Sequence, residues 1–349
     1  MKRDKLFCIG KGKGSTLSMP IASEGNVSLV NQSSIVQTIG DTTIQPGTSI
    51  TVPTDVGMAM LRRPEFKVEK PSINWEPGDK LQVSRFAGLG DLIFLVAACH
   101  GFHMYHPDVR IYVDAHPDHH EWLSWVPFIN VGKCNDPKFV VGTTSPSLVH
   151  TDRVNHIAEQ IGIEHHDIRF PIDIPNTDAC WLEDPILFAP YSAGAGARSL
   201  LASTVTQILE RAPEIDRNRF VFVPHNSHRG STGALRYSTG PLTIGELWEL
   251  VSVSTGVITV DTGVAWMAAA LGKPVLVFYT HSRPQETANA CSDIMAVEPV
   301  VPCAPCGLRD GDYPCEAGNH GFQCQSYYDW RVVMLRMAEF IKLVQGGPS

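Results

Sequence analysis

The chain has 349 residues, of which 43% are hydrophobic and 18% are charged, as is typical of a protein that forms packed cores in two or three domains. The formal net charge of −8 argues against a protein that coats nucleic acid, because phosphate neutralisation needs an excess of Lys and Arg. No run approaches the roughly 20 apolar residues that span a bilayer, and no signal-peptide core follows residues 1–5, so the sequence predicts a cytoplasmic protein.

Residues 1–70 differ in composition from the rest of the chain and predict a small β-rich module. They are rich in Ser, Thr, Val and Gly, with short alternating runs at residues 34–39 and 48–52 between turn signals. Residues 53–61 predict a short helix, and residues 67–78 have the composition of a linker. The module resembles small modules of bacteriophage proteins, which implies a viral source, a location in the host cytoplasm, and docking to a protein partner.

A first α/β lobe is predicted over residues 71–180. Residues 81–84, 91–99 and 109–113 have the character of a strand, a helix and a strand. At this spacing they form a βαβ unit, which requires a parallel sheet with a right-handed crossover.

A second α/β lobe is predicted over residues 181–349, because the same alternation begins again. Its strands are predicted at residues 186–189, 220–223, 256–260 and 275–279, and its helices at residues 200–211, 244–253 and 265–271. Ligands of such sheets bind beyond the carboxyl ends of the strands, so two facing lobes predict one cleft. Residues 327–344 predict an amphipathic helix that packs as core across the lobes.

The segment after the strand at residues 256–260 predicts an anion-binding helix start. Asp261, Thr262 and Gly263 follow this strand and open the next helix, so backbone amides and the positive end of the helix dipole face the cleft. That geometry suits a diphosphate. An ordinary helix cap by Asp261 or Thr262 is the alternative interpretation.

The run from residue 257 to 279 resembles the signature of the heptosyltransferase-like glycosyltransferases (family 9). That family has Asp-Ser/Thr-Gly after a strand, then His, an Ala-rich helix, Leu-Gly, Pro and a strand ending in Phe-Gly. The matching positions are residues 261–263, 268–272 and 274. Trp266 stands at the family's His and Tyr279 at its final Gly. The resemblance extends over residues 80–345 and implies a GT-B fold, that is, two Rossmann-like doubly wound lobes.

The resemblance also gives a role to the loop that contains Gly88, Gly90 and Asp91, which matches the family's first-lobe motif. The family's acid at this place takes the proton of the acceptor hydroxyl, so the resemblance implies Asp91 as the general base and the two glycines as part of the acceptor loop. An Asp at a helix start is stabilised as an anion, which fits that role. Simple capping of the helix is the alternative.

Four side chains near the predicted rim of the cleft are candidates for neutralising the charge of a donor diphosphate. They are Arg198, His228, Arg229 and Arg283. Solvated loop residues are an equal alternative for all four.

The nine cysteines are odd in number, which favours free thiols in a reducing compartment over a disulfide scaffold. Four of them are close enough in sequence to be candidates for a structural zinc site with thiolate ligands. They are Cys303, Cys306, Cys315 and Cys324. Free thiols or a disulfide are the alternatives, and the pattern lacks the open position of a catalytic metal.

The predicted function is transfer of a heptose-like or hexose sugar from a nucleotide-diphosphate sugar to an acceptor hydroxyl on a glycan, a protein or a modified base. We expect inversion and no metal or other cofactor in catalysis, since helix amides and arginines meet the charge of the leaving group. The alternative is a catalytically inactive GT-B scaffold with a structural or virion-associated role, because the Trp266 indole cannot replace the hydrogen bonds of an imidazole and is expected to fill the pocket. A nicotinamide-dependent oxidoreductase is weaker still, since residues 88–90 supply only part of the dinucleotide fingerprint.

Overall fold

The structure is a computed structural model, and side chains are described from residue 74 onward except those of His156 and Tyr237. The described residues are 26–31, 37–39, 42–44, 49–53, 66–68, 74–85, 88–142, 153–163, 167–175, 183–192, 198–212, 218–224, 237–240, 242–280, 282–287, 294–301 and 323–346.

The N-terminal module is made of short antiparallel strands, as its composition predicts. In one sheet β1 (Asn26–Asn31) lies between β4 (Ser49–Pro53) and β5 (Phe66–Val68), and β2 (Gln37–Ile39) pairs with β3 (Thr42–Ile44). Strand β5 overlaps the start of the predicted linker, because its backbone completes the sheet beside β1. The predicted helix at residues 53–61 begins at the last residue of β4, and its other residues lie outside the described ranges.

The first lobe contains a four-stranded parallel sheet in the order β8-β7-β6-β9. Its strands are β6 (Lys80–Arg85), β7 (Arg110–Ala115), β8 (Ile129–Val131) and β9 (Phe139–Gly142), and its helices are α2 (Leu89–Tyr105), η1 (Pro117–His119), α3 (His120–Leu123) and α4 (Arg153–Gln160). Every residue from 92 to 99 of α2 is buried, because this helix is covered on several sides at once.

The second lobe contains a six-stranded parallel sheet in the order β12-β11-β10-β13-β14-β15. Its strands are β10 (Ile186–Ala189), β11 (Phe220–Phe222), β12 (Tyr237–Ser238), β13 (Gly256–Val260), β14 (Val275–Phe278) and β15 (Ile294–Val297). Its helices are α5 (Ala202–Arg211), α7 (Ile244–Val253), α8 (Gly263–Ala270), η3 (Pro284–Glu286), η4 (Gln323–Gln325) and α9 (Trp330–Val344). The central strands are continuously buried and mostly apolar because helices cover both faces of a parallel sheet.

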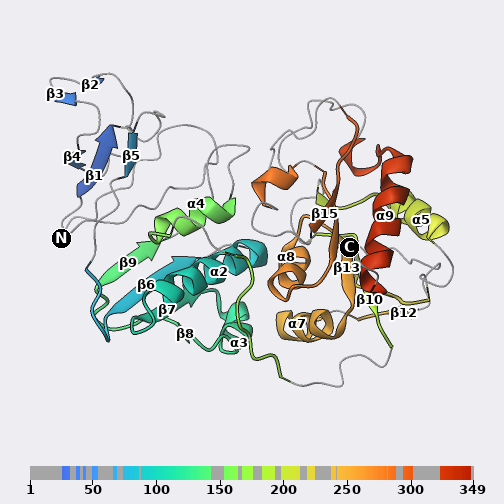
Figure 1. Cartoon of the computed structure of the whole chain (residues 1–349), viewed down its shortest axis with the longest axis horizontal. Coiled ribbons are helices and arrows are strands. Elements are labelled where there is room, and N and C mark those ends of the chain that lie inside the picture. Colours follow the sequence, from blue (N-terminus) through green and yellow to red (C-terminus); the bar gives the residue numbers. More distant parts are fainter. Residues whose placement is uncertain are drawn as a thin grey trace.

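These two parallel sheets confirm the predicted α/β architecture with two doubly wound lobes (Figure 1). The predicted boundaries near residues 70 and 180 stay predictions, since residues 69–73 and 176–182 lie outside the described ranges. None of the described helices combines the length and apolar character that crossing a bilayer requires.

In each sheet the chain adds strands first on one side of its first parallel strand and then on the other side. The point where the direction changes is the switch point of the sheet. In the first lobe this switch lies between β6 and β9, and in the second between β10 and β13. Ligands of open α/β sheets bind at such switch points, outside the carboxyl ends of the strands. The loops that follow β6 and β13 are therefore the places to examine for a site.

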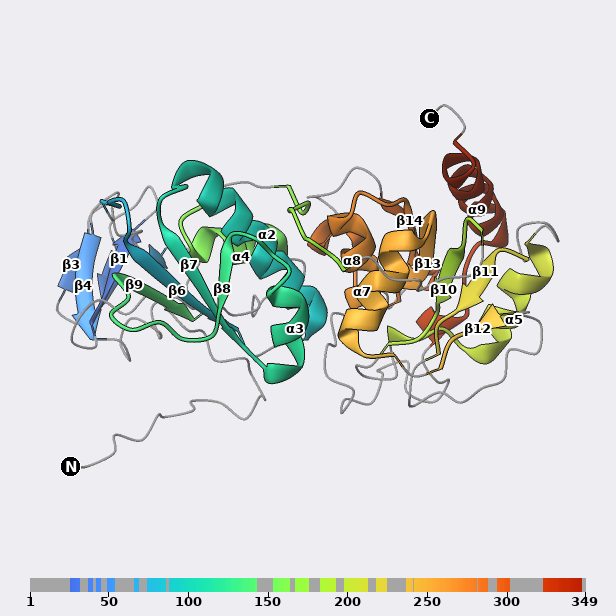
Figure 2. The same cartoon turned by 90° about the horizontal axis from the view of Figure 1, so that it is seen from below.

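The two lobes lie side by side and touch through two pairs of helices (Figure 2). Helix α2 packs on α8, and α3 packs on α7. Two aromatic pairs cross this interface: the ring centroids of Phe94 and Trp266 are 5.0 Å apart, and those of Trp122 and Trp248 are 5.4 Å apart. One buried apolar cluster consequently runs through both lobes.

Helix α9 is a core helix, but it packs on the second lobe rather than across both. It lies on β14 and β15, and the buried cluster that includes its apolar face consists of residues 186–344 among those described. Gly256 of β13 permits close packing of the helix end, since a Cβ there would lie 2.6 Å from Val344 and 2.9 Å from Phe340.

Candidate functional site

The first switch point holds Asp91, the acid implied as the general base. Gly88 is the N-cap of α2, and Asp91 lies in the first turn with a partly exposed side chain. Its carboxylate is 3.1 Å from the guanidinium of Arg85, the buried last residue of β6. The strand end therefore supplies a cation that orients the carboxylate at the start of the helix.

The second switch point holds the start of α8. Thr262 is the N-cap but makes no side-chain capping hydrogen bond, so the interpretation as an ordinary cap by this hydroxyl is wrong. Its hydroxyl lies 3.4 Å from the hydroxyl of Thr259 instead. Thr262, Gly263 and Val264 are half-buried, which leaves the first turn of α8 partly open to an incoming group.

The starts of α2 and α8 meet at two glycines. A Cβ added to Gly90 would lie 2.7 Å from Cδ1 of Trp266 and 3.8 Å from the Cα of Gly263. A Cβ added to Gly263 would lie 2.8 Å from the side chain of Leu89. The residues predicted for the acceptor loop and for the donor helix are thus in direct contact across the lobes.

Trp266, the residue at the family's His position, is buried between the two helices. Its indole packs on the ring of Phe94 with the two ring planes tilted, and it lies against Gly90. The ring therefore fills the space between α2 and α8, one turn into α8, below the partly exposed first turns of the two helices.

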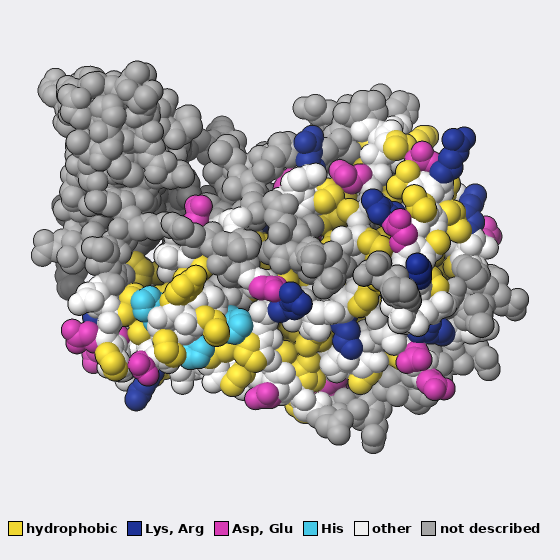
Figure 3. All heavy atoms as spheres, viewed as in Figure 1, with side chains coloured by type: hydrophobic (Ala, Val, Ile, Leu, Met, Phe, Trp, Pro, Cys, Tyr) yellow, Lys and Arg dark blue, Asp and Glu magenta, His cyan; other side chains and the backbone are white. Residues whose placement is uncertain are grey.

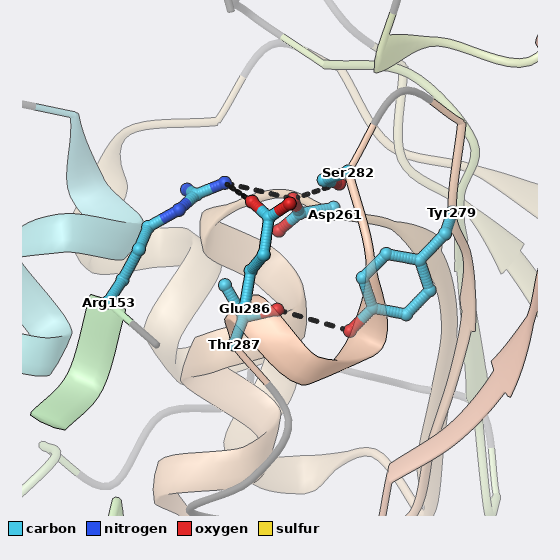
Figure 4. A network of polar contacts seen from close by, with 6 residues as sticks. All are labelled: Arg153, Asp261, Tyr279, Ser282, Glu286 and Thr287. Atoms are coloured by element: carbon cyan, nitrogen blue, oxygen red, sulfur yellow. Dashed lines mark hydrogen bonds and ion pairs between the residues drawn. The ribbon is translucent and has the colours of Figure 1, made fainter. Parts of the chain in front are cut away.

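A buried network of charges joins the lobes beside this contact (Figure 4). Arg153, the first residue of α4, lies 3.7 Å from the carboxylate of Asp261 and 3.5 Å from that of Glu286. Ser282 donates a hydrogen bond of 2.6 Å to Asp261. The Asp261 side chain thus belongs to this network and lies directly before the start of α8.

Tyr279, where the family has Gly, anchors the loop that completes the network. Its hydroxyl lies 3.2 Å from that of Thr287, directly after Glu286, and its carbonyl oxygen accepts a 3.0 Å hydrogen bond from Tyr328. Burial raises the pKa of Tyr279, so the phenol stays protonated as a hydrogen-bonding group.

The other predicted charge-neutralising residues fall into two groups. Arg198 is half-buried in the segment that follows β10, and Arg283 is exposed directly after Ser282, so both lie beyond strand ends at the same sheet edge as Asp261. His228 and Arg229 lie outside the described residues.

Of the predicted metal-binding cysteines only Cys324 is described, and it is buried in η4. Cys303, Cys306 and Cys315 lie outside the described residues, within which no group of three or more potential metal-binding side chains is found.

Sequence reasoning gave no site role to Arg85, Arg153, Ser282 or Glu286. A signal was present for the two arginines. Arg85 ends a strand that is predicted to lie inside a parallel sheet, where a charge requires a partner, and Arg153 opens a helix, where the dipole disfavours a cation. Each position therefore suggests a carboxylate partner, although the sequence does not identify which one.

Comparisons with known proteins agree with this geometry. Residues 236–312 match the sequence model of a family described as Glycosyltransferase family 9 (heptosyltransferase). The sequences of curated proteins give no match.

Several solved structures share the fold. The iron-containing dodecameric glycosyltransferase TibC from enterotoxigenic E. coli is 14% identical, with 93% of this chain and 94% of TibC aligned at a TM-score of 0.64. The heptosyltransferase WaaC of E. coli, determined with ADP, is 11% identical over 75% of this chain and 99% of its own, with a TM-score of 0.55. A family 9 glycosyl transferase from Veillonella parvula is 12% identical over 78% and 100%, with a TM-score of 0.54. These likenesses establish the GT-B fold expected from the sequence.

We predict that Gly90→Ala destabilises the protein by about 1–3 kcal/mol, because the added methyl group overlaps the Trp266 indole. Gly88→Ala is the matched control: nothing lies within 4 Å of its Cβ position, and only a poorer N-cap is expected, at about 0.5 kcal/mol. Urea unfolding of the two variants measures the difference. Equal losses would contradict the close approach of α2 and α8.

Proposed function

We propose that the protein transfers a sugar from a nucleotide-diphosphate sugar to an acceptor hydroxyl, with inversion and without a catalytic metal. The observation that supports this most strongly is the contact between the starts of α2 and α8. It brings the Asp91 loop and the partly exposed start of α8 together where both sheets have their switch points.

In the proposed mechanism the first turn of α8 binds the donor diphosphate. Backbone amides at Thr262, Gly263 and Val264 and the positive end of the helix dipole suit an anion. Arg198 and Arg283, with His228 and Arg229, neutralise the charge that develops on the diphosphate as it leaves.

Asp91 is the proposed base on the opposite lobe. It accepts the proton of the acceptor hydroxyl while the oxygen forms a bond to the anomeric carbon and the bond from that carbon to the diphosphate breaks. Attack from the face opposite the leaving group inverts the anomeric centre. Arg85 holds the carboxylate in place throughout.

A heptose donor is supported by the family match and by the relatives. WaaC was determined with ADP, and TibC in complex with ADP-D-β-D-heptose. An ADP-activated heptose is therefore the first donor to test, ahead of nucleotide hexoses. The acceptor class, the cytoplasmic location, the viral source and the docking role of the N-terminal module stay predictions from the sequence.

A catalytically inactive scaffold is the second candidate, and the buried Trp266 favours it. An indole between α2 and α8 supplies packing where the family has an imidazole that can accept and donate hydrogen bonds. The partly exposed first turns of both helices favour the enzyme instead.

We also propose that the four cysteines hold a structural metal ion. Four thiolates are a donor set that suits zinc or iron, TibC contains iron, and the described member, Cys324, is buried. The ion would bind Cys303, Cys306, Cys315 and Cys324 and hold the segment between β15 and α9 together.

Asp91→Asn is predicted to lower the rate of nucleotide release from ADP-heptose by about 10²–10⁴-fold, because the amide cannot take the proton. Donor affinity should stay near that of the wild type. Asp118→Asn, an exposed carboxylate on the same lobe, is the control and should leave the rate unchanged. Unchanged turnover in Asp91→Asn would remove this residue as the base.

Calorimetric titration distinguishes the enzyme from the scaffold. The enzyme proposal predicts that the wild-type protein binds ADP-heptose or another sugar nucleotide in the range of about 1 μM to 1 mM. The scaffold proposal predicts no binding of any common donor to the wild type. Binding gained only in Trp266→His would identify the indole as the obstruction.

Metal analysis of the purified full chain should find about one zinc or iron ion per molecule, and chelation should lower the unfolding temperature. Cys306→Ser should lose the ion. Cys134→Ser, a half-buried cysteine of the first lobe, should retain it. A wild-type protein without bound metal would contradict this proposal.

A further inference from the structure

Five charged side chains gather where the two lobes meet, and most of their surface is removed from water. Arg85 and Arg153 come from the first lobe together with Asp91, and Asp261 and Glu286 come from the second. Arg153 is 6% exposed, Asp261 4% and Glu286 1%. Buried charges of this kind are tolerated only when opposite charges neutralise them.

The two carboxylates of the second lobe are neutralised by a cation of the first lobe, Arg153. Asp261 follows β13 and Glu286 ends η3, whereas Arg153 opens α4, which packs along α2. One nitrogen of the guanidinium, Nη2, lies near both carboxylates, so a single cation faces the two acids from one position. Separating the lobes would leave these two acids without that cation.

Arg153 also acts electrostatically on the carboxylate proposed as the base. Burial alone would lower the pKa of Arg153, but Asp261, Asp91 and Glu286 together raise it. One cation thus interacts with Asp91 on its own lobe and with Asp261 at the start of the donor helix.

We infer that Arg153 is a positioning residue that sets the register of the two lobes, so that Asp91 faces the donor at the start of α8. This inference rests on the proposed function. Arg153 does not serve as a ligand of the donor phosphates, because its guanidinium is buried and already committed to two carboxylates.

The loop that follows β14 holds the two carboxylates that Arg153 faces. Tyr279 and Thr287 hold the loop that carries Glu286, and Ser282 of this loop fixes the Asp261 carboxylate (Figure 4). Contacts within the second lobe therefore hold both acids, independently of Arg153.

The test compares the wild type with Arg153→Met, Arg153→Lys and the double variant Arg153→Met/Glu286→Gln. Arg110→Met, an exposed residue of the first lobe, is the control. For each protein we would measure the kcat of nucleotide release from ADP-heptose, the donor Kd, and hydrogen exchange in the peptides of α2 and α8.

Arg153→Met should lower kcat by about 10²-fold, since a base misplaced by about 1 Å costs that much. Donor Kd should stay within a factor of about three, because the donor binds the second lobe. Exchange should rise in the first turns of α2 and α8. Arg153→Lys should recover part of kcat, since it keeps the charge but carries it on a more flexible side chain.

The double variant distinguishes an effect on the position of the lobes from a loss of stability. It removes the buried Glu286 charge together with the Arg153 cation, so fewer unpaired charges stay buried than in Arg153→Met. It should regain thermal stability but not kcat. Recovery of kcat along with stability would overturn the inference, as would an unchanged kcat in Arg153→Met. If the wild type releases no nucleotide, the proposed function fails, and hydrogen exchange then tests the register role of Arg153 by itself. Unchanged exchange at α2 and α8 in Arg153→Met would overturn the inference. A rise in exchange there would uphold the register role.

Discussion

Helices α2 and α8 each begin at the switch point of their own sheet, and each has a glycine where the two cross. Gly90 and Gly263 allow backbones from different lobes to approach more closely than any side chain would permit. In the proposed mechanism the Asp91 carboxylate and the amides of α8 act on one substrate, which requires this contact. The aromatic packing around Trp266 and the ion pairs of Arg153 both stabilise it from the sides.

Charge is distributed differently inside this junction and on the surface. On the face in Figure 3, Lys and Arg side chains of the second lobe are interspersed with Asp and Glu. Such a mixed surface produces little directed field beyond a Debye length. The interior junction is the opposite case, since its charges lie in a region of low dielectric where each interaction is stronger. Recognition of a charged donor would therefore depend on local geometry rather than on long-range attraction.

The sequence predicted the strands and helices of both lobes well, because parallel strands covered on both faces are continuous apolar runs. Strand β13 and helix α7 have the predicted bounds, and Thr243 and Glu246 form the capping box that starts α7. The edge strands β8, β9, β12 and β15 were missed, since they are only partly buried and lack the continuous burial of the central strands.

The site was predicted only as far as local motifs reach. Asp91 and residues 261–263 stand in recognisable contexts, a glycine loop and a strand-to-helix turn. Arg153 and Glu286 are 133 positions apart, and their pairing depends on how two lobes dock. The packing of Trp266 against Gly90 likewise comes from that docking. The sequence showed that Trp266 stands at the family's His position, but not which residues of the other lobe the indole contacts.

The apolar cluster that runs through both lobes constrains the evolution of the sequence. In many two-domain proteins one half can be exchanged for a relative's without disturbing the other. Here Trp122 and Phe94 of one half are packed on Trp248 and Trp266 of the other. A transplanted half would bring a mismatched surface, so the two halves are expected to have diversified as a matched pair.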